Sequence, residues 1–135
     1  PALRNRSDAI LMPHIGASTA EAEENCAVMA ADQIKAFLDH GNIRNSVNFP
    51  AIELERTTDS RLTVTNRNAP GTLSHILNVL GDANLNVADL LNKSRGDIAY
   101  NLIDLNSTPS PDVLDSVRAV DGVINVRYLG KPCSI

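Results

Sequence analysis

Residues 61–129 alternate between the two-residue periodicity of a strand and the 3.6-residue periodicity of a helix, and this order constrains the fold more than any other feature. Leu62 and Val64 alternate with threonines, which predicts a half-buried strand. The next apolar residues recur at i, i+3, i+4 and i+7, which predicts a helix from about Gly71 to Asp82. This apolar stripe consists of Leu73, Ile76, Leu77 and Leu80.

The second half of this region repeats the pattern with one additional strand. Two strand-like segments, LNVADLLNK and IAYNLIDLN, are separated by the turn SRGD. The segment STPSPD then opens a short helix with apolar residues at Val113, Leu114, Val117 and Val120, and GVINVRYL follows as a strand. This order predicts an α+β, ferredoxin-like βαββαβ fold, in which a four-stranded antiparallel sheet has both helices on one face.

The first fifty residues have a different character. The apolar run Asp8–Met12 precedes a proline and predicts a buried strand that ends at a turn. Ser18 and Glu21 form an S-x-x-E capping box, which predicts a helix over Thr19–Asp39. Gly41 supplies its stop signal.

The predicted helix has an apolar stripe that no nearby element can bury. Residues 1–50 are therefore interpreted as part of a domain whose remainder lies elsewhere, residues 51–60 as a polar linker, and residues 61–135 as a second domain. Since the chain begins with Pro1 rather than Met, we expect a piece of a longer protein.

Charge and composition exclude several classes of partner. A net charge of −4 without a basic cluster argues against nucleic-acid binding, and no apolar run approaches the roughly 18 residues of a membrane span. Cys26 and Cys133 have neither metal-ligand nor disulfide spacing, so we expect no metal site and a cytoplasmic location.

The tract PHIGASTAEAEENCAVMAADQIKAFLDHGNIRNSVNFP resembles the end of the catalytic portion of NAD-dependent D-2-hydroxyacid dehydrogenases, and the remainder resembles an ACT regulatory domain. Together they resemble the C-terminal part of the D-3-phosphoglycerate dehydrogenases. The resemblance implies a parent enzyme that oxidises 3-phosphoglycerate to 3-phosphohydroxypyruvate with NAD, at the entry to L-serine biosynthesis.

The resemblance also assigns roles to the PHIGA tract. It implies that His14 is the general acid/base that exchanges a proton with the substrate hydroxyl, a task suited to an imidazole that titrates near neutrality. His14, Ile15, Gly16 and Ala17 would contact the nicotinamide cofactor. Because the chain contains no G-x-G-x-x-G loop, we expect it to bind NAD weakly and to be inactive alone.

The loop TNRNAPG leads into a predicted helix N-terminus, where unpaired N–H groups and the helix dipole suit a carboxylate. By resemblance, an amino-acid effector, L-serine, would bind between two ACT domains of a homo-oligomer. Its ligands would be Asn66, Asn68 and Asn86, although histidine stands in the place of Asn66 in serine-inhibited relatives.

Two alternatives stay open. The chain could be an oligomerisation or regulatory module that binds a different amino acid or none. It could also be the tail of another D-2-hydroxyacid dehydrogenase that has an ACT domain.

Overall fold

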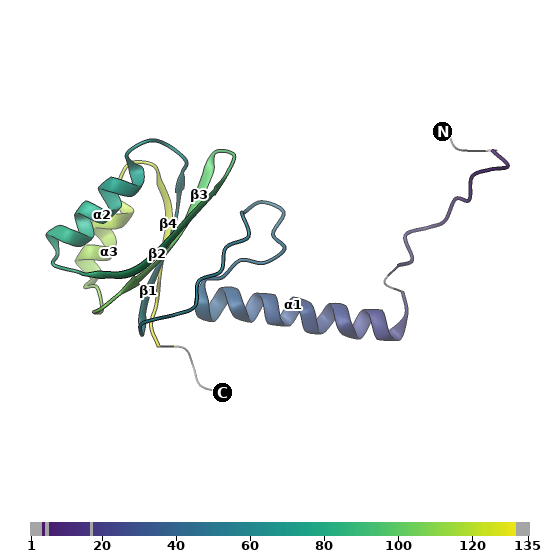
Figure 1. Ribbon diagram of the computed structural model, residues 1–135, viewed down its shortest axis with the longest axis horizontal. Coiled ribbons are helices and arrows are strands. Elements are labelled where there is room, and N and C mark those ends of the chain that lie inside the picture. The colour runs from purple at the N-terminus through teal and green to yellow at the C-terminus, as the bar shows by residue number, and fades with distance from the viewer. Residues whose placement is uncertain (1–3, 5, 17, 132–135) are drawn as a thin grey trace. The chain divides into compact units, whose positions relative to one another are not determined.

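The computed structural model describes residues 4, 6–16 and 18–131 (Figure 1). The chain divides into two compact units, residues 1–32 and 33–135. The elements are α1 (Ala20–His40), β1 (Ser60–Arg67), α2 (Thr72–Asp82), β2 (Val87–Arg95), β3 (Ile98–Leu105), α3 (Pro111–Arg118) and β4 (Val123–Leu129).

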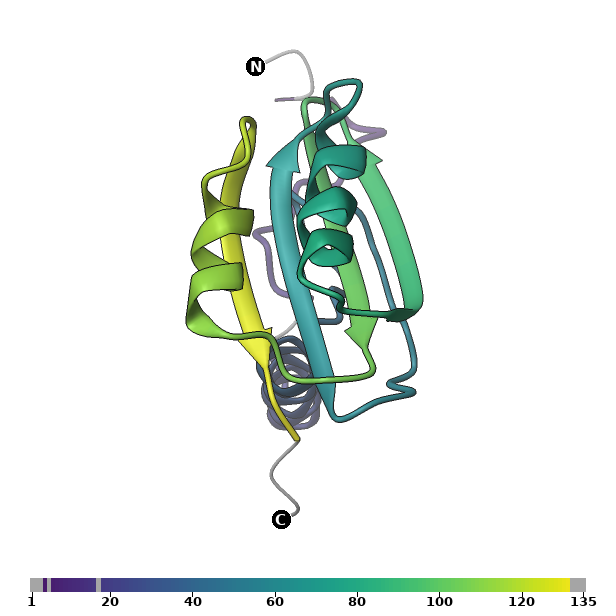
Figure 2. The same cartoon turned by 90° about the vertical axis from the view of Figure 1, so that its left-hand side faces the viewer.

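The four strands form one sheet in the order β2-β3-β1-β4, and all neighbours pair antiparallel. Helices α2 and α3 lie together on one face of this sheet (Figure 2). The predicted ferredoxin-like βαββαβ fold is thereby confirmed, and each predicted helix and strand of residues 61–129 is present within about two residues of its expected limits.

Apolar side chains fill the space between the sheet and the helices α2 and α3. Strands β1 and β3 contribute alternate residues, and the helices contribute their apolar stripes, as the sequence pattern predicted. The buried cluster consists of Leu62, Val64, Ile76, Leu80, Ile103, Leu105, Val117 and Val126.

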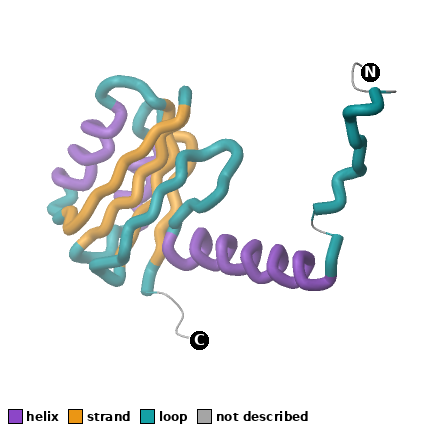
Figure 3. Tube along the Cα trace, turned by 45° about the vertical axis from the view of Figure 1, so that its right-hand side comes forward, coloured by secondary structure: helices purple, strands orange, loops and turns teal. Residues whose placement is uncertain are grey.

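The opposite face of the sheet is also covered, which the sequence did not reveal. The segment between α1 and β1 forms a loop closed by an Ile43–Ile52 bridge, and it packs on Tyr100 and Leu102 of β3 (Figure 3). Thr63 on this face is 3% exposed. The half-buried character predicted for β1 was therefore wrong, because a polar-looking segment folds back over the face expected to contact water.

The carbonyl groups at the end of α1 bind side chains of the sheet unit. Four consecutive carbonyls each accept a hydrogen bond, three from guanidinium groups and one from a phenol hydroxyl. These groups would otherwise lack partners at a helix C-terminus, where positive charge is also favourable. We call the four donors the α1 clamp; its pairs are Leu38 O–Arg127 (3.3 Å), Asp39 O–Arg56 (3.2 Å), His40 O–Arg61 (2.9 Å) and Gly41 O–Tyr100 (2.9 Å).

Arg61 is the centre of the α1 clamp and is fully buried together with Asp104. The two side chains form a two-pronged ion pair, with Nε–Oδ1 at 2.5 Å and Nη2–Oδ2 at 2.8 Å. Arg61 also donates to the carbonyls of Leu54 and Glu55, and Asp104 accepts from the backbone and hydroxyl of Thr57. Residues 54–57, expected to be a linker, are thus fixed to the sheet.

Burial alone would raise the pKa of Asp104, but the hydrogen bonds from Arg61 and Thr57 outweigh it, and the pKa of Asp104 is lowered. The carboxylate is therefore ionised at neutral pH. Each polar side-chain atom of Arg61 and Asp104 has a hydrogen-bonding partner, either the other member of the pair or a neighbouring group. A buried ion pair is tolerated only under this condition.

Gly41 lets the end of α1 approach β1 closely. Its φ of +73° is a left-handed conformation, and its amide donates to Phe37 O at 3.0 Å. A Cβ at this position would lie 2.4 Å from Cγ2 of Thr63. Any side chain at residue 41 would therefore be strained twice, by its backbone conformation and by the sheet.

The unit at residues 1–32 differs from the expectation in two respects. Asp8–Met12 is not a strand, and Ile10 is 89% exposed, because a strand needs a hydrogen-bonding neighbour and none is present among the described residues. Helix α1 is present, but Thr19 rather than Ser18 caps it, since Thr19 Oγ1 accepts from Ala22 N at 3.2 Å. The division into 1–50, 51–60 and 61–135 stays a prediction.

Replacing Gly41 by alanine should lower the free energy of unfolding by about 1–3 kcal/mol, through left-handed strain and contact with Thr63. Denaturant titration of both proteins measures this difference. Gly81→Ala is the control, because a Cβ there meets nothing within 4 Å and alanine favours the helix interior, so it should leave stability equal or slightly higher. Equal effects at the two sites would contradict the role given to Gly41.

Asp104→Asn should destabilise the protein by about 3–5 kcal/mol at pH 7, because it leaves the buried Arg61 charge without a counter-ion. The pH dependence has a definite sign. Since folding lowers the pKa of Asp104, its contribution is fully present above the unfolded-state pKa of about 3.9 and is lost as pH falls through the folded value. The variant should therefore show a smaller loss of stability in acid.

Asp115→Asn is the matched control for Asp104→Asn. Asp115 forms an ion pair with Arg118 in which both side chains are at least half exposed. Such a pair contributes about 0–1 kcal/mol, so unfolding should change little. If Asp115→Asn lowered the free energy of unfolding as much as Asp104→Asn, burial of the Arg61–Asp104 pair would not explain the effect at Asp104.

Candidate functional site

The loop between β1 and α2 is the candidate effector site, and backbone hydrogen bonds hold it to two neighbouring loops. Arg67 N donates to Gly122 O at 2.7 Å, and Asn68 N donates to Asp97 O at 2.8 Å. Gly71 precedes α2 with φ +88°, and among the described residues no side chain caps this helix. Thr72 N donates to Ala69 O at 3.4 Å, and the N–H groups that follow it in the first turn of α2 can meet an anionic ligand.

Asn66 lies at the end of β1 and is 3% exposed. Its Nδ2 donates to Arg67 O at 2.7 Å, and its Oδ1 accepts from Nδ2 of Asn101 at 2.7 Å. One N–H bond of Nδ2 and one lone pair of Oδ1 remain for a ligand. Most of the hydrogen-bonding capacity of this side chain is thus used inside the protein.

Asn101 and Asn92 extend this network across the sheet, and sequence reasoning missed both. The buried Asn101 also donates to Val64 O at 3.0 Å, and Asn92 on β2 donates to Asn101 Oδ1 at 2.5 Å. A signal was available in the sequence: Asn101 occupies an inward position of β3 where the periodicity calls for an apolar residue. A polar residue in such a row needs an internal partner.

Asn68 and Asn86 are both exposed but lie at different ends of the sheet. Asn68 Nδ2 donates to Gly96 O at 3.1 Å, which sets the loop against the β2–β3 turn. Asn86 directly precedes Val87, which pairs with Leu105, whereas Asn66 pairs with Ala99. Six residues of strand separate these positions by about 20 Å, so one chain does not bring Asn86 together with the other two.

His14, Ile15 and Gly16 are exposed and belong to the unit at residues 1–32. Ala17 lies outside the described residues, as does Cys133. Within the described part of the chain, no residue forms a hydrogen bond with the His14 imidazole, and no atom lies within 4 Å of a Cβ built on Gly16. Among the described residues of 1–32, no site surrounds His14, Ile15 and Gly16.

The described residues hold no group of three or more histidine, cysteine or acidic side chains placed to bind a metal ion. Among the helices of the same residues, none is long and apolar enough to cross a membrane.

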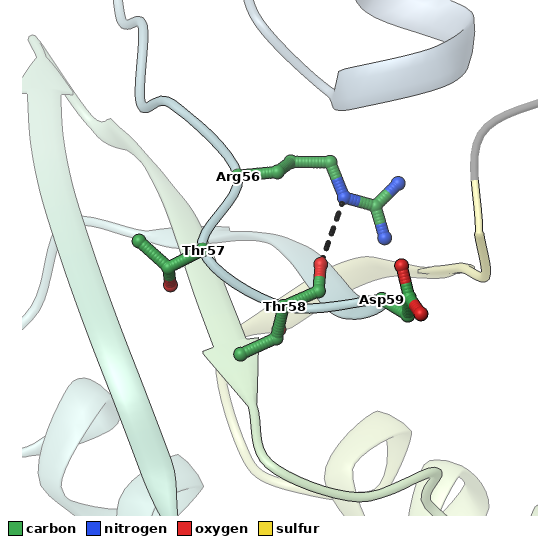
Figure 4. Close-up of a pocket in the computed structure, with 4 residues that line it drawn as sticks. All are labelled: Arg56, Thr57, Thr58 and Asp59. Carbon is green, nitrogen blue, oxygen red and sulfur yellow. Dashed lines mark hydrogen bonds between the residues drawn. The ribbon is translucent and has the colours of Figure 1, made fainter.

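A polar surface pocket lies beside the α1 clamp, lined by Arg56, Thr57, Thr58 and Asp59 (Figure 4). The guanidinium of Arg56 is already engaged: its Nε donates to Thr58 O at 3.4 Å, and its other nitrogens donate to Asp39 O and Leu129 O. Burial, followed by the charge of Arg61, lowers the pKa of Arg56. We interpret this pocket as part of the contact between the end of α1 and the sheet.

Comparison with curated proteins gives similarity over most of the chain. D-3-phosphoglycerate dehydrogenase of Haemophilus influenzae is 35% identical over 128 residues, covering 94% of this chain and 31% of that protein. The Escherichia coli enzyme of the same name is 30% identical over 122 residues, covering 89% of this chain and 30% of that protein. D-3-phosphoglycerate dehydrogenase 1 of Saccharomyces cerevisiae is 32% identical over 128 residues, and the match covers 89% of this chain and 27% of that protein. The chain thus spans about a third of the length of these relatives.

Solved structures are more distant. The ACT domain from GTP pyrophosphokinase of Chlorobium tepidum aligns with a TM-score of 0.42 at 20% identity, covering 52% of this chain and 95% of that one. No protein-family model matches the chain.

Proposed function

We propose that this chain, whose sequence matches the C-terminal, ACT-containing part of D-3-phosphoglycerate dehydrogenases over 89–94% of its length, is the amino-acid-sensing part of such an enzyme. The effector is L-serine, and it binds between two copies of the chain. The parent protein oxidises 3-phosphoglycerate to 3-phosphohydroxypyruvate with NAD. The effector is then the end product of the route that this reaction begins.

The observation that supports a shared site is the separation of the three asparagines. Asn66 and Asn68 lie at the loop end of the sheet, whereas Asn86 precedes β2 at the other end. In the described part of the chain, no strand pairs with the outer edge of β2. If two β2 edges pair antiparallel, Asn86 of each copy comes to the loop end of the other.

Asn68 favours this arrangement, because its contact with Gly96 O holds the loop toward the β2–β3 turn, which adjoins the β2 edge. The residues that would meet there suit a zwitterion. The open N–H groups of α2 can bind the carboxylate, while asparagine oxygens can accept hydrogen bonds from the ammonium group. Pairing would also enlarge the small core of a fold of this size.

The catalytic role of His14 rests on resemblance and needs residues that this chain does not contain. His14 would exchange a proton with the substrate hydroxyl, and Ile15, Gly16 and Ala17 would lie against the cofactor. NAD would supply the hydride acceptor. The residues present do not form a dinucleotide cradle by themselves, since the chain contains no G-x-G-x-x-G loop.

A second candidate function is an oligomerisation module that binds a different amino acid or none. The burial of Asn66 favours this alternative, since the side chain is 3% exposed and already bonded at both ends of its amide. Dimer formation without a response to serine would distinguish it from the proposal above.

A shared site can be tested by mixing two inactive variants. Asn68→Ala and Asn86→Ala should each abolish or strongly weaken L-serine binding in calorimetric titration. In a mixed dimer, one of the two sites combines the intact loop of one chain with the intact Asn86 of the other. Random exchange should therefore restore about one quarter of the wild-type binding capacity.

Asn125→Ala serves as the control, because Asn125 is exposed on the opposite edge strand, β4. It should retain full serine binding. If the mixture of the two variants recovered no binding although native mass spectrometry showed mixed dimers, the site would lie within one chain. Wild-type protein that binds no serine would contradict the proposed effector.

The 135-residue chain by itself should not reduce NAD with 3-phosphoglycerate, because it contains His14 but no nucleotide-binding loop. Absorbance of NADH at high protein concentration measures this activity, with a complete D-3-phosphoglycerate dehydrogenase as positive control. Turnover above background that disappears in His14→Ala would contradict this prediction.

A further inference from the structure

Three asparagine side chains form a continuous series of hydrogen bonds on the helix face of the sheet, from the exposed Asn92 on edge strand β2 to the end of β1. Asn92 Nδ2 donates to Asn101 Oδ1 at 2.5 Å, and Asn101 Nδ2 donates to Asn66 Oδ1 at 2.7 Å. Asn66 Nδ2 then donates to Arg67 O at 2.7 Å. We call this series the amide relay; all of its bonds run in the same direction, toward the loop.

Backbone carbonyls fix the direction of the amide relay. A carbonyl oxygen can only accept, so the Asn101 atom 3.0 Å from Val64 O and the Asn66 atom 2.7 Å from Arg67 O must both be amide nitrogens. The other end of each amide is then oxygen. Reversing Asn66 would place its oxygen against Arg67 O, and it would also turn its nitrogen toward the nitrogen of Asn101.

We propose that Asn101 is a positioning residue of the effector site, which holds Asn66 so that an incoming amino acid meets an N–H donor rather than a carbonyl oxygen. This inference rests on the proposed function and specifies its chemistry. Asn101 occupies one lone pair of Oδ1 of Asn66, so the donor that Asn66 can offer to a ligand is the second N–H of Nδ2. That donor selects the carboxylate of an amino acid over the ammonium group.

The position of Asn101 in β3 supports a role beyond packing. Its inward-facing neighbours on the strand are Ala99, Ile103 and Leu105, and all three are buried. Burying an amide in such a row is unfavourable unless both of its ends are bonded, and a β-branched apolar residue would fit the row without that requirement. Both N–H groups of Asn101 are used, one on the backbone and one on Asn66.

The test replaces Asn101 by an isosteric group that cannot donate. In Asn101→Asp, the carboxylate faces Oδ1 of Asn66, so Asn66 either reverses or loses its partner. L-serine should bind at least about tenfold more weakly. The preference for L-serine over L-serinamide, which has no carboxylate, should also fall, because one of the donors that distinguish them, Nδ2 of Asn66, is displaced while the N–H groups of α2 remain.

Asn125→Asp is the matched control, since it makes the same chemical change at an exposed position of the same sheet. It should retain both the affinity and the preference of the wild type. Asn101→Ser is a second variant in case the aspartate prevents folding, because its hydroxyl can donate only one bond. It should also reduce the preference, and thermal unfolding of each variant establishes that the protein tested is folded.

The outcomes separate this inference from the proposed function. If Asn101→Asp and Asn101→Ser weaken serine and serinamide by the same factor, Asn101 has a structural role only and the inference is wrong. Unchanged serine binding in both variants has the same meaning and leaves the proposed function intact. A wild-type chain that binds no amino acid overturns the proposed function and this inference together.

Discussion

The buried ion pair between Arg61 and Asp104 is the interaction on which the rest of this structure depends. Two charges removed from water are tolerated only when every donor and acceptor is matched. Here the matching groups come from the end of α1, from residues 54–57 and from β3. The hydrogen bonds of the ion pair therefore connect three segments that are distant in the sequence. They also fix residues 54–57, which have the composition of a linker, against the sheet.

The two faces of the sheet use polar burial in different ways. On the face covered by residues 41–54, charged groups are bonded to one another and to carbonyls, which fixes the end of α1. On the helix face, neutral amides form a directional series that ends at Arg67, next to the β1–α2 loop. The first arrangement attaches the end of α1 to the sheet, and the second fixes the orientation of the Asn66 amide. Both exploit the low dielectric of the interior, where an unmatched polar group is costly and a matched one is well defined.

Sequence reasoning succeeded where the physics is local. The alternation of Leu62 and Val64 and the stripe through Ile76 and Leu80 specify which residues face the helices, because the side-chain period of each element is fixed by its backbone. It failed at Asp8–Met12, where apolar composition alone favoured a strand. A strand requires a partner, and a sequence pattern does not supply one.

The sequence by itself determined the βαββαβ order, the interior of the helix face and the resemblance on which the proposed function rests, because periodicity and motif are properties of neighbouring residues. Only the tertiary structure decided which polar groups meet. Nothing in the spacing of Arg61 and Asp104, or of Asn66, Asn92 and Asn101, indicates that they touch. Strand register brings them together, and it likewise places Asn86 and Asn66 at opposite ends of the sheet.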